Sequence, residues 1–247
     1  MCSPRTCARA STPRSPPTSS TSARRRPWAW AAAESRRNRR GHSWRTTREV
    51  YLVRHGQSQW QVSPSEDWDT SLSPLGHDQA KHLGQWFTED APLDAATRLT
   101  VGSVLTSPLK RARETAEYLC ESLELSAEVQ PTLTEATFHV VSELPRAAAP
   151  FVPWPEDPLS ARYLDFRAQA RAALAELTRR AEETRQPVLA VTHGGLIKTV
   201  VRTIAESDSF CLKLYNCGIN AIEWTNGRWR VVHVNLWDHL PPALRTT

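Results

Sequence analysis

The sequence lacks several features that would place it in familiar protein classes. No apolar run approaches the roughly 18–20 residues of a membrane-spanning helix, so we expect no membrane association. The five cysteines show no paired metal-ligand spacing, and their odd count in 247 residues is typical of a reduced, cytoplasmic protein. The G-K-[ST] signature of a phosphate-binding loop is also missing. We therefore predict a cytoplasmic protein with no metal site.

The first 47 positions contain no lysine and only one acidic residue, and their arginines account for the positive net charge of the whole chain. Residues 1–47 contain 11 arginines, no lysine and one acid, Glu34, so they carry a net charge of +10. The remainder contains 20 basic and 25 acidic residues and carries −5, although the whole chain carries +5. The basic character belongs to this extension, and the acidic remainder argues against nucleic acid as a substrate.

The extension, residues 1–47, is rich in Arg, Ser and Pro and has almost no large aliphatic side chain. It cannot bury enough apolar surface to offset the entropy lost on ordering, so we predict that it is disordered. Three interpretations remain open. It resembles an organellar transit peptide in composition, a basic arm could bind nucleic acid, or it is an extension without function.

Residues 48–240 alternate short apolar runs with amphipathic segments. Buried strands are predicted over 49–54, 101–107 and 187–193, and helices over 74–89, from Ser107-Pro108 to about 123, over about 160–185 and after Gly194. Two further strands flank Asn226-Gly227, a strong hairpin signal. We predict a single α/β domain with a mainly parallel central sheet, flanking helices and a C-terminal hairpin.

Polar residues gather where the predicted parallel strands end, and ligands of such sheets bind at that edge. The first strand ends in Arg54-His55-Gly56, and the third runs into His193-Gly194-Gly195. The helix after the second strand carries Arg111. Arginines and a helix N-terminus suit a phosphoryl group, and a neutral imidazole is a competent nucleophile. Glu135 could supply the proton that a leaving alkoxide needs.

Four segments in this order give a specific family resemblance. They are LVRHGQSQW, LSPLGHDQA, TSPLKRARETA and VTHGGL. With them the chain, from about residue 49 to 240, resembles the histidine phosphatase superfamily, in the branch that includes cofactor-dependent phosphoglycerate mutases and many small-molecule phosphatases.

The resemblance implies a role for each matching residue. His55 would be the nucleophile that becomes phosphohistidine, with Arg54, Arg111 and His193 around the phosphoryl oxygens. Glu135, in the family's L-x-E pattern, would be the acid and then the base that activates water. Binding roles are implied for three further residues: Gln61, where related chains often carry Asn, Ser73, and Gly194, whose lack of a side chain allows close approach.

The chain departs from the family pattern after Glu135. The common F-G-x-W-E-G continuation is absent, and Glu143 and Glu156 are alternative acids. The segment 136–158 contains five prolines but is too apolar for a free loop. It either packs as a satellite core or forms a lid over the leaving group, and we favour a lid that accepts an apolar or ring-bearing alcohol.

The function expected from the sequence is a metal-independent phosphatase. It would hydrolyse a small phosphorylated metabolite through a phosphohistidine and would need no cofactor. Two alternatives stay open: a phosphoglycerate mutase-type phosphomutase, and a module that binds a phosphorylated ligand without catalysis.

Overall fold

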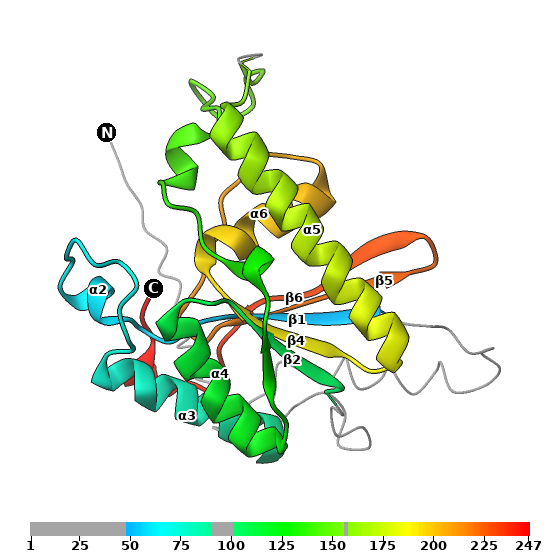
Figure 1. Cartoon of the computed structure of the whole chain (residues 1–247). Helices are drawn as coiled ribbons and strands as arrows, with labels where there is room; N and C mark the ends of the chain where they lie inside the picture. Colours follow the sequence, from blue (N-terminus) through cyan, green and yellow to red (C-terminus); the bar gives the residue numbers. More distant parts are fainter. Residues whose placement is uncertain (1–47, 90–100, 156–157) are drawn as a thin grey trace, which may run out of the picture. The chain divides into compact units, whose positions relative to one another are not determined.

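The computed structural model describes residues 48–89, 101–155 and 158–247 (Figure 1). Among them, six strands form one sheet in the order β3-β2-β4-β1-β5-β6. The strands are β1 (Arg48–Arg54), β2 (Ser103–Thr106), β3 (Ala127–Val129), β4 (Val188–Thr192), β5 (Ile219–Thr225) and β6 (Arg228–Leu236). The predicted disorder of residues 1–47 lies outside the described residues.

The sheet is mixed, and its parallel part is the larger. β1 pairs with β4, β4 with β2 and β2 with β3, all in parallel, whereas β5 is antiparallel to both β1 and β6. Asn226 and Gly227 both have positive φ, as the turn between β5 and β6 requires. The predicted single α/β domain with a C-terminal hairpin is therefore confirmed.

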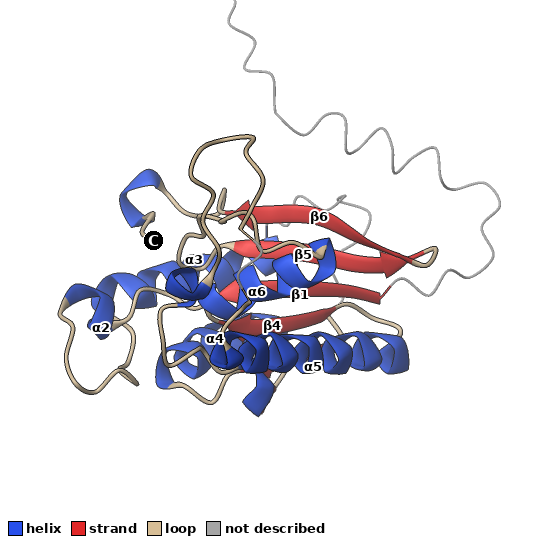
Figure 2. Ribbon diagram, turned by 90° about the horizontal axis from the view of Figure 1, so that it is seen from above, coloured by secondary structure: helices blue, strands red, loops and turns tan. Residues whose placement is uncertain are grey.

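Helices cover both faces of the sheet (Figures 1 and 2). On one face lie α5 (Ala161–Thr184) and α6 (Gly194–Ala205), and on the other α3 (Pro74–Glu89) and α4 (Lys110–Leu123). Successive side chains of a strand point to opposite faces. Accordingly, Val50 and Leu52 belong to the core under α5, while Tyr51 and Val53 belong to the core under α3. A strand buried on both faces needs the continuous apolar run that β1 has.

Serine side chains begin two of the predicted helices. Ser73 Oγ accepts a hydrogen bond from Gly76 N at 3.0 Å at the start of α3, and Ser160 Oγ accepts one from Tyr163 N at 3.3 Å at the start of α5. The helix predicted to start at Ser107-Pro108 begins later, at Lys110, with Leu109 as its N-cap residue. The hydroxyl of Ser107 pairs with His193 Nε2 at 2.7 Å.

Several short elements were not predicted. They are the strand β3, the helix α2 (Gln59–Val62) and three 3₁₀-helices over 131–133, 140–143 and 242–244. Segments of three or four residues are too short to show a periodic pattern of apolar side chains, so tertiary contacts determine their structure.

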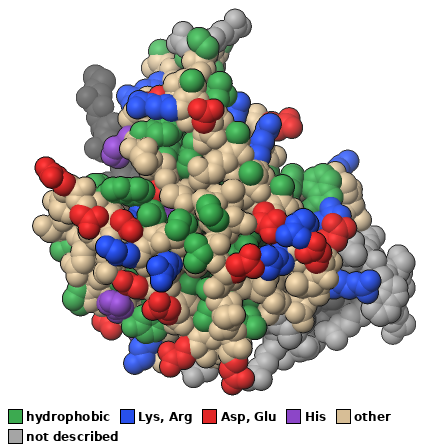
Figure 3. All heavy atoms as spheres, in the orientation of Figure 1, with side chains coloured by type: hydrophobic (Ala, Val, Ile, Leu, Met, Phe, Trp, Pro, Cys, Tyr) green, Lys and Arg blue, Asp and Glu red, His purple; other side chains and the backbone are tan. Residues whose placement is uncertain are grey.

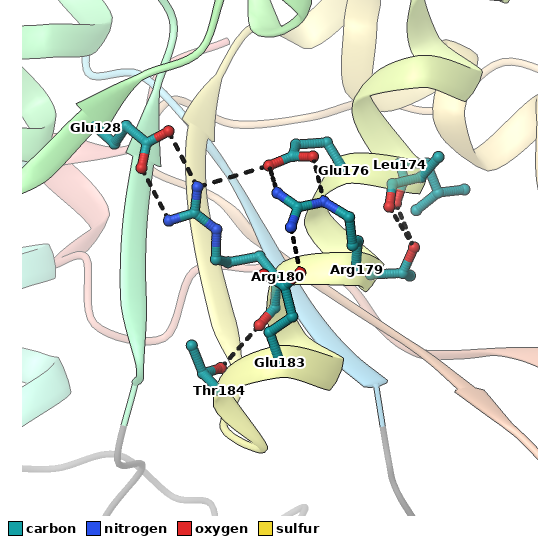
Figure 4. A network of polar contacts seen from close by, with 9 residues as sticks. Glu128, Leu174, Glu176, Arg179, Arg180, Glu183 and Thr184 are labelled. Atoms are coloured by element: carbon teal, nitrogen blue, oxygen red, sulfur yellow. Dashed lines mark hydrogen bonds and ion pairs between the residues drawn. The ribbon is translucent and has the colours of Figure 1, made fainter.

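Charged side chains tie α5 to the edge of the sheet (Figure 4). Arg180 donates from both terminal nitrogens to Glu128 on β3, at 2.8 and 3.0 Å. Arg179 pairs with Glu176 and Glu183 along the helix surface. Such exposed pairs stabilise a fold little. Figure 3 shows that basic and acidic side chains of the described residues are interspersed on the face of the molecule that it draws.

The parallel strands place their carboxyl ends at one edge of the sheet. β1 ends at Arg54, which pairs in register with Thr192 at the end of β4, and Thr106 ends β2 beside Val191. The residues that follow these three strands must therefore lie close together.

Among the described residues, no helix has the length and apolar character needed to cross a bilayer.

Candidate active site

A cavity of about 470 Å³ opens at this edge of the sheet. Five of the predicted site residues line it together: Arg54, His55, Gln61, Arg111 and Glu135. Its wall also includes the segment 136–141 and two aromatic side chains, Trp60 and Trp68. The volume is that of a pocket for a small molecule. The fold therefore brings the predicted arginines and the predicted glutamate together with His55 at one cavity.

His55 has the hydrogen bonds that a nucleophilic imidazole needs. Its Nδ1 lies 2.6 Å from the carbonyl oxygen of Gly56, so Nδ1 carries the proton and donates it. Nε2 is then unprotonated, and Arg111 Nε donates to it at 3.2 Å. Burial, followed by the charges of neighbouring histidine and arginine groups, lowers the pKa of His55 well below 6.5. The ring is held neutral with its lone pair available.

Arg111 is held in place from the opposite side. Its Nη1 donates to the carbonyl oxygen of Trp68 at 2.8 Å, and its guanidinium carbon lies 5.4 Å from the centre of the Trp68 ring. The backbone carbonyl of Arg111 accepts from Thr115 Oγ1 at 2.7 Å, and Thr115 Oγ1 also accepts from Gly56 N at 3.0 Å. These two hydrogen bonds of Thr115 join the loop after β1, next to His55, to the first turn of α4.

Arg54 also lines the cavity. Its Nη1 donates to the carbonyl oxygen of Leu214 at 2.6 Å, while its Nε is buried and has no partner in the part of the chain that the structure describes. A side chain at Gly194 would place Cβ 3.4 Å from that Nε. Gly194 therefore shapes the space around Arg54, and it is not among the residues that line the cavity. An unpaired buried N–H next to a cavity is a donor ready for an anionic ligand.

His193 lies behind His55, with the two ring centres 5.0 Å apart. It is fully buried, its Nε2 pairs with Ser107 Oγ at 2.7 Å, and its Nδ1 has no partner among the described residues. Burial and the two arginines hold the pKa of His193 well below 6.5. His193 therefore lies next to the ring of His55 and does not line the cavity.

Glu135 is fixed by backbone amides of two segments. Gly195 N, at the start of α6, donates to Oε2 at 2.8 Å, and Ala136 N donates to Oε1 at 3.0 Å. Burial raises the pKa of Glu135 above its ordinary 4.5, while the two amide hydrogen bonds and the charges of Arg111 and Arg54 oppose the rise. A buried carboxyl with a raised pKa is suited to proton transfer.

Replacing Gly195 with alanine is expected to displace Glu135 and to lower kcat of any proton-transfer reaction by about 10²-fold. The added Cβ would lie 2.3 Å from Glu135 Oε1. This is too short for a non-bonded contact, so the carboxylate would have to move. Gly194→Ala is the matched control, because its Cβ would meet its nearest neighbour only at 3.4 Å. The two variants are compared in steady-state turnover. Equal losses would contradict this account of Gly195.

Gln61 lines the cavity, but its amide is already paired. Its Nε2 donates to Asn216 Oδ1 at 3.2 Å, and its Oε1 accepts from Asn216 Nδ2 at 3.1 Å and from Ser58 N at 3.1 Å. Asn216 Nδ2 also donates to the carbonyl oxygen of His55 at 3.0 Å. In this structure Gln61 braces the loop of His55 through Asn216, a residue that the sequence analysis did not single out.

Ser73 and the alternative acids do not enter the cavity wall. Ser73 is buried, and its hydroxyl donates to Gln57 Oε1 at 2.8 Å while capping α3. Glu143 pairs with Arg162 on α5 and does not line the cavity. Glu156 lies outside the described residues. The geometry thus places Ser73 in support of the loop after His55, without direct access to a ligand.

The site also contains residues that the sequence analysis missed. Lys198 and Arg202 of α6 line the cavity, as do Trp60 and Trp68. Lys198 follows Gly195 by three positions and Arg202 by seven, so a helical wheel that starts at Gly195 would have placed both on its face. No comparable signal marks the tryptophans, whose loop has no periodic pattern.

Comparison with known proteins agrees with this geometry. The family model described as "Histidine phosphatase superfamily (branch 1)" matches residues 50–236. The chain belongs to the histidine phosphatase superfamily. The family that the motifs predicted is confirmed, and the match covers every residue assigned to the cavity above.

Relatives in this superfamily include both phosphatases and mutases. The chain is 27% identical over 204 residues to the uncharacterized phosphatase PhoE of Bacillus subtilis (strain 168), covering 77% of this chain and 96% of PhoE. It is 26% identical over 198 residues to the probable phosphoglycerate mutase GpmB of Enterobacter sp. (strain 638), covering 73% and 87%. The structure of mycobacterial glucosyl-3-phosphoglycerate phosphatase aligns with a TM-score of 0.54, 25% identity and coverage of 76% and 99%.

Proposed function

We propose that this histidine phosphatase hydrolyses a small phosphomonoester without a metal ion, through a phosphohistidine at His55. One observation carries the proposal. The neutral His55 ring directs an unprotonated Nε2 toward a cavity, and Arg111 Nε already donates to that atom. A donor that now contacts the lone pair can move to a phosphoryl oxygen when phosphorus takes its place.

In the first step, His55 Nε2 attacks phosphorus in line with the bond to the leaving oxygen. The N–P bond forms as the P–O bond breaks, and Glu135 gives its proton to the departing alkoxide. Arg54 and Arg111 hold the equatorial oxygens, where negative charge is spread in the transition state. His193 stabilises the same charge from beneath the ring of His55.

In the second step, the ionised Glu135 takes a proton from water as the water attacks the phosphohistidine. The P–N bond breaks, inorganic phosphate forms, and His55 returns to its neutral state. Glu135 is protonated again and ready for the next turnover. The amides of Ala136 and Gly195 support the carboxylate in both protonation states, because each donates to one of its oxygens.

The pH dependence of kcat/KM is expected to be bell-shaped, with its maximum on the acidic side of neutrality. The depressed pKa of His55 moves the acidic limb, where the nucleophile becomes protonated, to lower pH. The raised pKa of Glu135 moves the basic limb to higher pH, and the protonated acid is lost as pH rises through that pKa. The basic limb should therefore disappear in Glu135→Gln. An identical basic limb in wild type and variant would contradict the assignment.

The proposed function is tested by phosphate release from a panel of sugar phosphates, phosphoglycerates, nucleotides and aryl phosphates. The assay contains EDTA, and the full chain is compared with His55→Ala. Release that persists in EDTA and vanishes in the variant is the expected result. Absence of release from every ester, or release abolished by EDTA, would overturn the proposal.

The similarity to GpmB favours phosphomutase activity as a second candidate. A mutase must transfer the phosphoryl group back to an acceptor before water reaches the phosphohistidine. The same preparation therefore receives 3-phosphoglycerate, and formation of 2-phosphoglycerate is measured beside phosphate release. Isomerisation faster than hydrolysis would establish the mutase.

A further inference from the structure

Helix α6 carries a row of cationic side chains that the proposed catalytic steps do not use. Gly195, Lys198 and Arg202 follow one another at steps of three and four residues, and all three line the cavity. At 1.5 Å per residue, Lys198 lies about 4.5 Å and Arg202 about 10 Å along the helix from Gly195. Because Gly195 N contacts Glu135, this row leads away from the reacting atoms into the rest of the cavity.

Lys198 brings a positive charge to the cavity without a fixed partner. It is half-buried, and among the described residues no hydrogen bond or ion pair of its ammonium group is found. Burial and the charges of Arg54 and Arg202 lower its pKa, while Glu135 opposes this. Glu135 is near enough to affect that pKa, but among the described residues no ion pair joins its carboxylate to Lys198.

Arg202 is more deeply buried, with 2% of its surface exposed. Its Nε donates to the carbonyl oxygen of Phe210 at 3.2 Å, and its Nη2 lies 3.9 Å from Cys211 Sγ. Its Nη1 is buried, and among the described residues it has no hydrogen-bond partner. A buried guanidinium with an unpaired donor is costly in a folded protein, unless a ligand supplies the acceptor.

We propose that Lys198 and Arg202 form a second anion subsite, so that the preferred substrate is a phosphomonoester whose alcohol carries a second anionic group. The inference rests on the proposed function, which places the reacting phosphoryl group between Arg54 and Arg111. The second group, a carboxylate or a phosphate, would lie against α6 and accept hydrogen bonds from both cations.

Part of the cavity wall is apolar and suits a short carbon skeleton. Phe138, Val140 and Val141 line it, and Phe138 packs on Phe166 of α5 with ring centres 6.0 Å apart. These apolar side chains contact the carbon atoms of a ligand and leave its charged ends to the two cationic subsites. The segment predicted as a lid thus contributes the apolar part of the wall.

The test compares matched esters that differ in the second anion. 3-Phosphoglycerate and glycerol 3-phosphate differ in a carboxylate, and propane-1,3-diol bisphosphate and 3-hydroxypropyl phosphate differ in a phosphate. We expect the wild-type kcat/KM to favour the anionic member of at least one pair by about tenfold or more, as for a charge-assisted hydrogen bond. Lys198→Met should lower that ratio at least fivefold. The pair with the larger drop identifies the anion.

Lys81→Met is the matched control, because Lys81 is exposed on α3 and does not line the cavity. Its selectivity ratios should equal those of the wild type. An equal loss of turnover for both members of a pair would overturn the inference, since Lys198 would then act through Glu135. Equal wild-type kcat/KM within both pairs would also overturn it and leave the phosphatase intact. Absence of hydrolysis of any ester would instead remove the proposed function itself.

Discussion

Replacement of His55 with alanine is expected to lower kcat for phosphate release by about 10⁴-fold or more, because the proposed covalent intermediate forms on its Nε2. Asn216 and Gly56 contact the backbone and ring of His55, and Arg111 contacts its Nε2. The backbone contact of Asn216 survives in the variant, so the loop should keep its position. Stopped assays over hours are needed to quantify the residual rate.

His82→Ala is the matched control for this variant, because His82 belongs to α3 and does not line the cavity. Its turnover should remain within about twofold of the wild type. Both variants are checked for thermal unfolding, since a lower Tm in His55→Ala alone would complicate a comparison of rates at high temperature. A loss of less than tenfold in a folded His55→Ala protein would exclude His55 as the nucleophile.

Replacement of Glu135 with glutamine is expected to have the second-largest effect, and its size should depend on the leaving group. An alkyl ester needs a proton on its leaving oxygen, so kcat should fall about 10²–10⁴-fold. A nitrophenyl ester leaves without that proton, so the first step should survive. Hydrolysis of the phosphohistidine then limits the rate, because no base activates water, and the assay should show a burst of nitrophenol.

Glu143→Gln serves as the control for this prediction. Glu143 is one of the two alternative acids in the sequence, and it pairs with Arg162 of α5. Its turnover of alkyl and nitrophenyl esters should match the wild type. A loss of alkyl ester hydrolysis in Glu143→Gln, with normal activity in Glu135→Gln, would show that Glu143 is the general acid and that Glu135 is not.

The arrangement of the catalytic candidates was predictable because parallel strands bring their carboxyl ends together. Apolar runs located β1, β2 and β4, and each run is followed by a polar residue that reaches the same edge. The motifs around His55 and His193 then identified the family. Both inferences depend on local patterns, and such patterns are strongest in fully buried strands.

The hydrogen-bond partners of two predicted binding residues escaped the sequence analysis. Gln61 was expected to bind substrate, but a neutral amide can equally pair with another amide, and only the structure brings Asn216 beside it. Ser73 was expected near substrate, yet its position before Pro74 makes it a cap, and Gln57 occupies its hydroxyl proton. A polar residue type alone does not distinguish these partners.

Lys198 and Arg202 were missed for a different reason. The helix after Gly194 was recognised from its apolar stripe of Leu196, Val200 and Ile204, and the opposite positions of such a helix are normally solvated. Here that other side faces the cavity, because Gly195 at the first turn packs against Glu135. The loop that carries Glu135 thus converts a surface position into a lining position.

The most direct test of the account is detection of the phosphorylated enzyme. Glu135→Gln is mixed with a nitrophenyl phosphate for milliseconds to seconds, quenched under alkaline conditions that preserve phosphohistidine, digested and examined by mass spectrometry. The account predicts an acid-labile phosphoryl group on the peptide that contains His55, with a stoichiometry that follows the burst. A phosphoryl group on another residue, or turnover of the ester with an unmodified enzyme throughout, would contradict it.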